Sequence, residues 1–142
     1  MKWATQGAVW LSALWWASLT VLGFLVVPLL FVHLPTPAMA GQMAAKLFTA
    51  QTWLSVACTL ALFMIFRRNQ AESHIESTHT ATIFVATGLL LALLVEFAVA
   101  PRIIARENLA LWHGVGSAMF VAQWVCAAWC FHRVLSSAAA DA

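Results

Sequence analysis

The sequence predicts an all-α integral membrane protein, a bundle of four transmembrane helices. Of its 142 residues, 63% are apolar and only 8% are charged, whereas a soluble domain is about half apolar and about a quarter charged. Four separate stretches reach the roughly 20 apolar residues that a helix needs to cross a bilayer. None of them shows the alternation of polar and apolar residues that is typical of a membrane barrel strand.

The four predicted spans cover about residues 8–32, 49–66, 80–100 and 111–134 of a single domain that takes in residues 1–142. The first span holds no charge, and the third holds one, Glu96. We expect residues 38–48 to form a short interfacial helix that leads into the second span. We expect Pro101 to follow the end of the third span, because proline cannot continue the hydrogen-bond ladder of a helix. No internal repeat is evident.

An even number of spans places both termini on one side of the membrane. Lysine and arginine are in excess on the cytoplasmic side, and Arg67 and Arg68 lie on the side of the termini, directly at the end of a span. We therefore expect both termini to be cytoplasmic. The small residues Ala38 and Ala40 resemble a signal cleavage site, but the apolar run before them is about 25 residues, longer than a signal peptide has. We expect the first span to be retained.

The composition and the motifs limit the function. A net charge of +2 without a basic stripe argues against a nucleic-acid partner. Three cysteines cannot complete a disulfide framework. The sequence contains no Ser-His-Asp arrangement, phosphate loop, pair of catalytic carboxylates or nucleotide motif. No catalytic residue is predicted, and the sequence gives no support to an enzyme.

Small residues at four-residue spacing predict where the helices pack, because they let two backbones approach closely in lipid. Two such rows lie in the third and fourth spans, and a short connection makes these spans antiparallel neighbours. The rows consist of Gly88, Ala92, Glu96 and Ala100 in the third span and of Gly114, Ala118, Ala122, Cys126 and Cys130 in the fourth. The two cysteines continue the second row, so packing is favoured for them over redox or metal chemistry.

Glu96 is the main candidate for chemistry, because an ionisable side chain inside a span marks a functional site by default. His113 enters the fourth span from the same side and at a similar depth, and Arg102 lies on the connection between them. Either residue is a plausible partner for Glu96, and Ser117 lies four residues from His113 on one helix face. Two interpretations remain open: the pair closes the end of the hairpin, or it binds a proton, a cation or a polar substrate.

No cofactor is favoured by the sequence. His74, Glu76 and His79 provide mixed ligands for a metal such as zinc, but their spacing matches no known site and a solvated loop is the simpler interpretation. His33 and His113 are candidate axial ligands for haem, since histidine commonly serves that role. Both lie near the same side of the membrane.

Several short segments resemble the TMEM205-like family of small four-helix membrane proteins, known in bacteria as a domain of unknown function (DUF4149). The segments are residues 22–34, 41–48, 96–103 and 112–117, the last reading Trp-His-Gly-Val-Gly-Ser where the family has Leu-His-Gly-x-Ser-Ser. The resemblance implies the four-helix fold, a bacterial inner membrane, and importance of Pro28, Phe48, Pro101, His113 and Gly114. It implies no particular activity.

From these observations we expect an accessory or assembly subunit of a larger membrane complex, without catalytic activity. Its partners would be membrane lipid and other membrane subunits, or further copies of the chain itself. The alternative is a metal- or haem-binding protein, or a transporter of ions or small molecules, with its polar site at Glu96 and His113.

Overall fold

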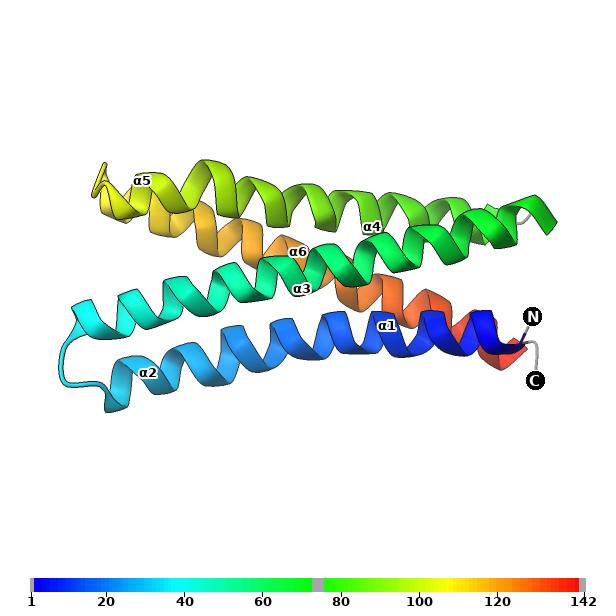
Figure 1. Ribbon diagram of the computed structural model, residues 1–142, viewed down its shortest axis with the longest axis horizontal. Coiled ribbons are helices and arrows are strands. Elements are labelled where there is room, and N and C mark those ends of the chain that lie inside the picture. The colour runs from blue at the N-terminus through cyan, green and yellow to red at the C-terminus, as the bar shows by residue number, and fades with distance from the viewer. Residues whose placement is uncertain (1, 73–75, 141–142) are drawn as a thin grey trace.

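The structure, a computed structural model, describes residues 2–72 and 76–140, with side chains for residues 4–68 and 80–140. It confirms the all-α fold class, since four long apolar helices lie side by side in an elongated bundle (Figure 1). The elements in order are α1 (Lys2–Val21), η1 (Leu22–Val26), α2 (Val27–His33), α3 (Pro37–Glu72), α4 (Glu76–Leu94), η2 (Val95–Val99), α5 (Ala100–Ile104) and α6 (Leu109–Ala140). The elements η1 and η2 are single π-helical segments inside longer helices.

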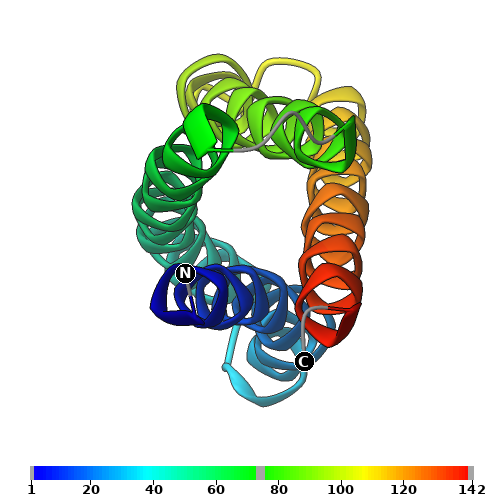
Figure 2. The same cartoon turned by 90° about the vertical axis from the view of Figure 1, so that its right-hand side faces the viewer.

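Four stretches are long and apolar enough to cross a membrane. They are Ala4–His33, Pro37–Arg68, Thr80–Ile104 and Leu109–Ala140, which indicates an integral membrane protein. Viewed along the bundle, α1, α3, α4 and α6 follow one another around a ring (Figure 2). Each of the four long helices therefore packs against two neighbours, α1 and α4 both lying between α3 and α6.

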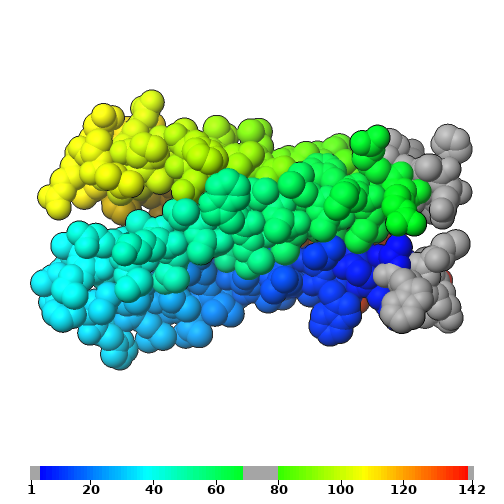
Figure 3. All heavy atoms as spheres, in the orientation of Figure 1, coloured from blue at the N-terminus to red at the C-terminus, as the bar shows by residue number. Residues whose placement is uncertain are grey.

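The two ends of the bundle differ. Both termini lie at one end, and the α2–α3 and α5–α6 turns lie at the other (Figure 1). At this second end the α5 region stands apart from the α2–α3 turn, and a notch separates them on the surface (Figure 3). Most side chains of α2 and α5 are exposed there, so the tight packing is found in the middle of the bundle and toward the termini.

The second span does not begin with a separate interfacial helix, as the sequence had predicted. Instead α3 runs without interruption from Pro37 to Glu72. Thr36 caps it, since its hydroxyl accepts a hydrogen bond of 3.3 Å from the Met39 N–H, and proline is well suited to the first turn of a helix. No proline or positive-φ residue follows within α3 to break it, so residues 38–48 continue straight into the span.

Pro101 does not follow the end of the third helix either, because it lies within α5, where the helix continues. The element before it, η2, is a π-helical segment, and Pro28 in α2 follows η1 in the same way. A π turn is wider than an α turn and is commonly found at a functional or strained point of a helix. Here it accommodates a residue that can donate no backbone hydrogen bond.

The structure shows an internal repeat that the sequence analysis missed. The first hairpin, α1 to α3, and the second hairpin, α4 to α6, bury equivalent residues, which lie 73 positions apart in the first helix of each hairpin and 72 positions apart in the second. In the first helix of each hairpin the buried pairs are Ala8 and Ala81, Ser12 and Val85, Trp15 and Gly88, and Leu19 and Ala92. In the second helix they are Gln51 and Gln123, Ser55 and Ala127, Cys58 and Cys130, and Leu62 and Val134. In both hairpins, a π segment and then a proline follow the buried residues of the first helix.

Equivalent residues of the two hairpins also touch one another. The Phe48 and Phe120 rings meet edge to face, with centroids 5.4 Å apart. Trp15 lies against Gly88, where an added methyl group would come within 2.5 Å of the indole ring. Contacts between equivalent residues are expected at an axis of two-fold symmetry. The bundle is therefore two similar hairpins related by an approximate two-fold axis that passes between them.

Candidate functional site

Glu96 lies in η2, half-buried against α3. The Thr49 hydroxyl of α3 donates a hydrogen bond to this carboxylate and lies 2.9 Å from Oε1 and 3.2 Å from Oε2. Eight residues separate Glu96 from Ile104, the end of the span, which corresponds to about 12 Å along a helix. The carboxylate is therefore inside the apolar part of the protein, where an ionised group is costly.

The partners that the sequence suggested for Glu96 lie elsewhere. Arg102 places its guanidinium over the Trp112 ring, 4.4 Å from the ring centre. His113 is exposed at the start of α6. Among the described residues, neither side chain pairs with the carboxylate. Ser117 is also exposed and makes no hydrogen bond to His113, so the structure does not assemble the predicted Glu96, Arg102, His113 and Ser117 group.

The geometry of the helix accounts for part of this difference. The prediction placed Glu96 on one face with Gly88 and Ala92, but residues four apart on an α-helix differ by about 40° around its axis, so Glu96 lies about 80° from Gly88. Glu96 also lies within η2, where the wider π turn interrupts the α-helix. Gly88 and Ala92 are buried in the bundle, whereas Glu96 lies at the edge of α3. A single sequence gives no clear sign of a π segment, apart from the proline that follows it.

The candidate cofactor ligands do not form a cluster in the described part of the chain. His33 is exposed, and its Nδ1 lies 3.0 Å from the Leu29 carbonyl of its own helix. No group of three or more His, Cys, Asp or Glu side chains that could hold a metal ion occurs among the described residues. His74 lies outside the described residues, and so do the side chains of Glu76 and His79.

A buried polar network in the middle of the bundle was not predicted. Gln51 donates to the Ser18 hydroxyl at 3.0 Å and to the Ser55 hydroxyl at 3.4 Å. Gln123 donates to the same Ser55 oxygen from α6, at 3.1 Å. The network links α1, α3 and α6, and it joins the two equivalent glutamines. Both glutamines are buried, Gln51 being 8% exposed and Gln123 4%. The sequence signal for this network was the pattern Phe-x-Ala-Gln, which occurs at residues 48–51 and again at residues 120–123.

The small-residue rows divide between the interior and the surface. Gly88, Ala92, Cys126 and Cys130 are buried, and the three cysteines, including Cys58, carry free thiols. Gly114, Ala118 and Ala122 are exposed instead. Residues four apart on an α-helix differ by about 40° around its axis, so a row of five cannot face one neighbour throughout. We call the exposed part, Gly114, Ala118 and Ala122, the α6 ridge.

Comparison with known proteins decides the family. The sequence pattern described as "Domain of unknown function (DUF4149)" matches residues 10–110, which is more than half of the chain. The chain belongs to the DUF4149 family. A search among curated proteins found no match, and a search among solved structures found none.

The DUF4149 match covers some of the features above and not others. It includes both π segments with Pro28 and Pro101, and it includes Thr49 and Glu96. It ends at residue 110, before the α6 ridge and before Gln123. The family description names no activity, so the function has to be argued from the structure of this DUF4149 protein.

Proposed function

We propose that this protein is a non-catalytic subunit of a larger membrane assembly, and that a transmembrane helix of another subunit packs on the α6 ridge. One observation carries this proposal. The small residues of the ridge are exposed, and among the described residues no atom beyond the adjoining backbone of α6 and the two chain neighbours lies within 4 Å of the position that a methyl group on Gly114 would take.

Two other glycines of the spans differ from Gly114, whereas Gly41 in α3 is open in the same way. A methyl group on Gly23 would overlap the Phe120 ring, and one on Gly88 would come within 2.5 Å of Trp15. Packing within the chain therefore requires glycine at both positions. Glycine inside a helix costs about 1 kcal/mol relative to alanine, and at Gly114 nothing in the described chain explains that cost. Close approach of a second helix explains it, because small residues are typical of helix contacts in membranes.

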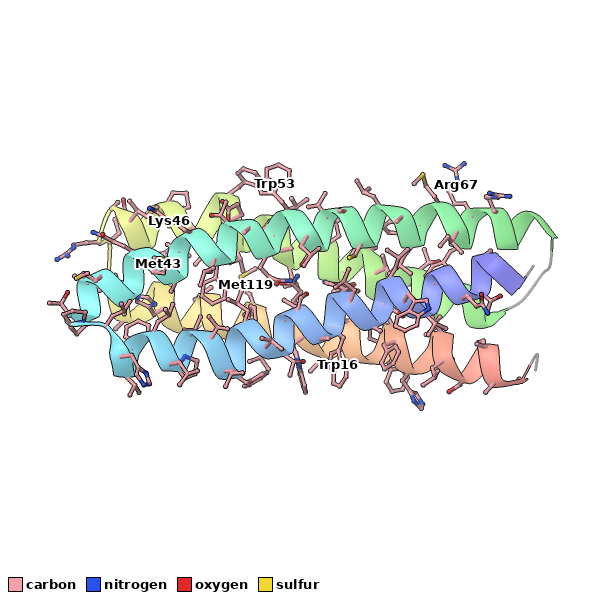
Figure 4. The ribbon with its side chains drawn as sticks, turned by 60° about the horizontal axis from the view of Figure 1, so that its bottom comes forward. Trp16, Met43, Lys46, Trp53, Arg67 and Met119 are labelled. Atoms are coloured by element: carbon pink, nitrogen blue, oxygen red, sulfur yellow. The ribbon has the colours of Figure 1, made fainter. Side chains whose placement is uncertain are left out.

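The location belongs to the same proposal. We place the protein in a bacterial inner membrane with both termini in the cytoplasm, in keeping with the Arg67–Arg68 pair at that end of the bundle and the positive-inside rule. Lys46 lies toward the other end of α3 (Figure 4). Kinship with TMEM205-like proteins, which the sequence segments suggested, is part of this proposal too.

The experiment compares two matched substitutions in protein produced at its native level and extracted in mild detergent. Ala118→Leu fills the ridge, whereas Ala86→Leu makes the same change on the exposed face of α4. We expect wild type and Ala86→Leu to purify with a stoichiometric second chain or as a homo-oligomer. Ala118→Leu should lose that chain at least ten-fold while remaining folded. A wild-type protein that is monomeric and free of partners would contradict the proposal.

A further inference from the structure

The two hairpins differ in polarity at one pair of equivalent contacts. Glu96 in the second hairpin is equivalent to Gly23 in the first, and Thr49 is equivalent to Val121. Beside Gly23 of the first hairpin lies the Phe120 ring of α6, so an apolar contact occupies this corner of the fold. At the equivalent corner the contact is a hydrogen bond between a carboxylate and a hydroxyl.

Oxygen atoms gather at this point. The Thr49 hydroxyl lies within 3.2 Å of both Glu96 carboxylate oxygens. The backbone carbonyl of Glu96 lacks its usual helical donors. The Ala100 N–H bonds to the Val95 carbonyl instead, and Pro101, the next residue, has no N–H. Carbonyls released at an interrupted membrane helix are known ligands for small cations.

The charge of the site indicates which ligand it takes. Among the described residues, no cationic side chain pairs with Glu96. Lys46, one turn before Thr49, is exposed on α3 (Figure 4), and Arg102 is held over Trp112. One carboxylate in an apolar environment is neutralised by one positive charge, whereas a divalent ion would leave one positive charge in excess. Oxygen ligands select hard cations.

We propose that Glu96 and Thr49 form a binding site for a monovalent cation of the sodium class, bound by the Glu96 carboxylate, the Thr49 oxygen and backbone carbonyl oxygen. This site goes beyond the proposed subunit role, since it uses η2 and α3 and not the α6 ridge. Absence of a second chain would therefore not contradict the cation site, and absence of cation binding would not contradict the subunit role. A proton also neutralises Glu96, so the experiment has to distinguish protonation from sodium binding.

The test uses the full-length protein in lipid nanodiscs and dicyclohexylcarbodiimide, an apolar reagent that modifies protonated carboxyl groups. Labelling of Glu96 is followed by mass spectrometry at fixed pH, with sodium chloride exchanged for choline chloride at constant ionic strength. We expect sodium to slow labelling at least five-fold. Glu96→Gln should not be labelled at this position. Thr49→Val should be labelled but lose the protection by sodium, and Thr49→Ser, which keeps the hydroxyl, should retain it.

A second measurement keeps the test decisive if the reagent does not reach Glu96. A ligand that binds the folded state raises the unfolding temperature. Sodium should therefore raise the unfolding temperature of wild type relative to choline, and should not raise that of Glu96→Gln. Equal labelling in the two salts shows a carboxyl that binds only protons and overturns the proposal. An equal unfolding temperature in the two salts, when no labelling occurs, overturns it as well.

Discussion

Trp15 and Gly88 occupy equivalent positions in the two hairpins and meet each other between them. The indole ring is fully buried and fills the space that the missing side chain of Gly88 leaves. One hairpin thus presents a large residue where the other presents none. This complementary pair makes the first and second hairpins fit each other better than two identical hairpins would.

The first prediction concerns two glycines that receive the same substitution. Gly88→Ala should destabilise the protein by about 1–3 kcal/mol, the usual cost of overfilling a packed interior, because the new methyl group comes within 2.5 Å of Trp15. Gly114→Ala should instead stabilise the isolated chain by up to about 1 kcal/mol, since alanine favours the helix. Reversible unfolding in mixed detergent micelles measures both. Effects of the same sign would contradict the packing described here.

The second prediction tests the equivalence of the hairpins. Trp15→Gly should cost about 3–5 kcal/mol, as for other losses of a large buried aromatic side chain. The double variant Trp15→Gly with Gly88→Trp moves the ring to the other side of the same contact. We expect it to recover more than half of the stability lost by the first substitution, measured by the same unfolding method. A double variant no more stable than Trp15→Gly would show that the two positions are not equivalent.

The sequence was sufficient to predict the four helices, because apolar length and composition determine what can cross a bilayer. It was not sufficient to predict the site. The expected pairs of Glu96 with His113 or Arg102 did not form. The partner that did form, Thr49, is a common residue in a span and gave no distinctive signal.

Two further features were missed for different reasons. The small-residue row of the fourth span was treated as one face, although it winds around the helix so that Gly114 is exposed and Cys130 is buried. The internal repeat was hidden because the two hairpins share few identical residues, among them Phe48 with Phe120 and Gln51 with Gln123. Apart from the repeated Phe-x-Ala-Gln, their likeness lies in which positions are buried, and the structure reveals these positions.

The third prediction concerns Ser55, which accepts hydrogen bonds from two buried glutamines. Ser55→Ala removes the shared acceptor and should lower the free energy of unfolding by about 1–2 kcal/mol, since one such bond between membrane helices contributes about 0.6 kcal/mol, at most about 1.7. Ser137→Ala removes an exposed hydroxyl bonded within its own helix and should have little effect. Equal effects of the two substitutions on unfolding would show that the network contributes nothing.

The fourth prediction concerns the turn between α5 and α6. Arg106 has φ of 57°, in the left-handed region, and its N–H bonds to the Ile103 carbonyl while the Glu107 N–H bonds to that of Arg102. This is the pattern in which a helix usually ends on glycine. Arg106→Gly should therefore stabilise the protein by about 1 kcal/mol, the cost of a left-handed side-chain residue.

The matched control for the turn is Ala105→Gly. Ala105 has φ of −71°, which any residue adopts, so glycine there should bring no gain in the midpoint of thermal unfolding. If Arg106→Gly and Ala105→Gly change this midpoint in the same way, the left-handed backbone at Arg106 is not a source of strain.

Site-specific photocrosslinking in intact membranes detects whether a second transmembrane helix lies on the α6 ridge, as we propose. The crosslinker p-benzoylphenylalanine is introduced at Ala118 on the ridge or at Ala86 on the exposed face of α4. We predict one discrete protein adduct from position 118 and only lipid adducts from position 86. Lipid adducts from both positions, or the same protein adducts from both, would contradict the claim.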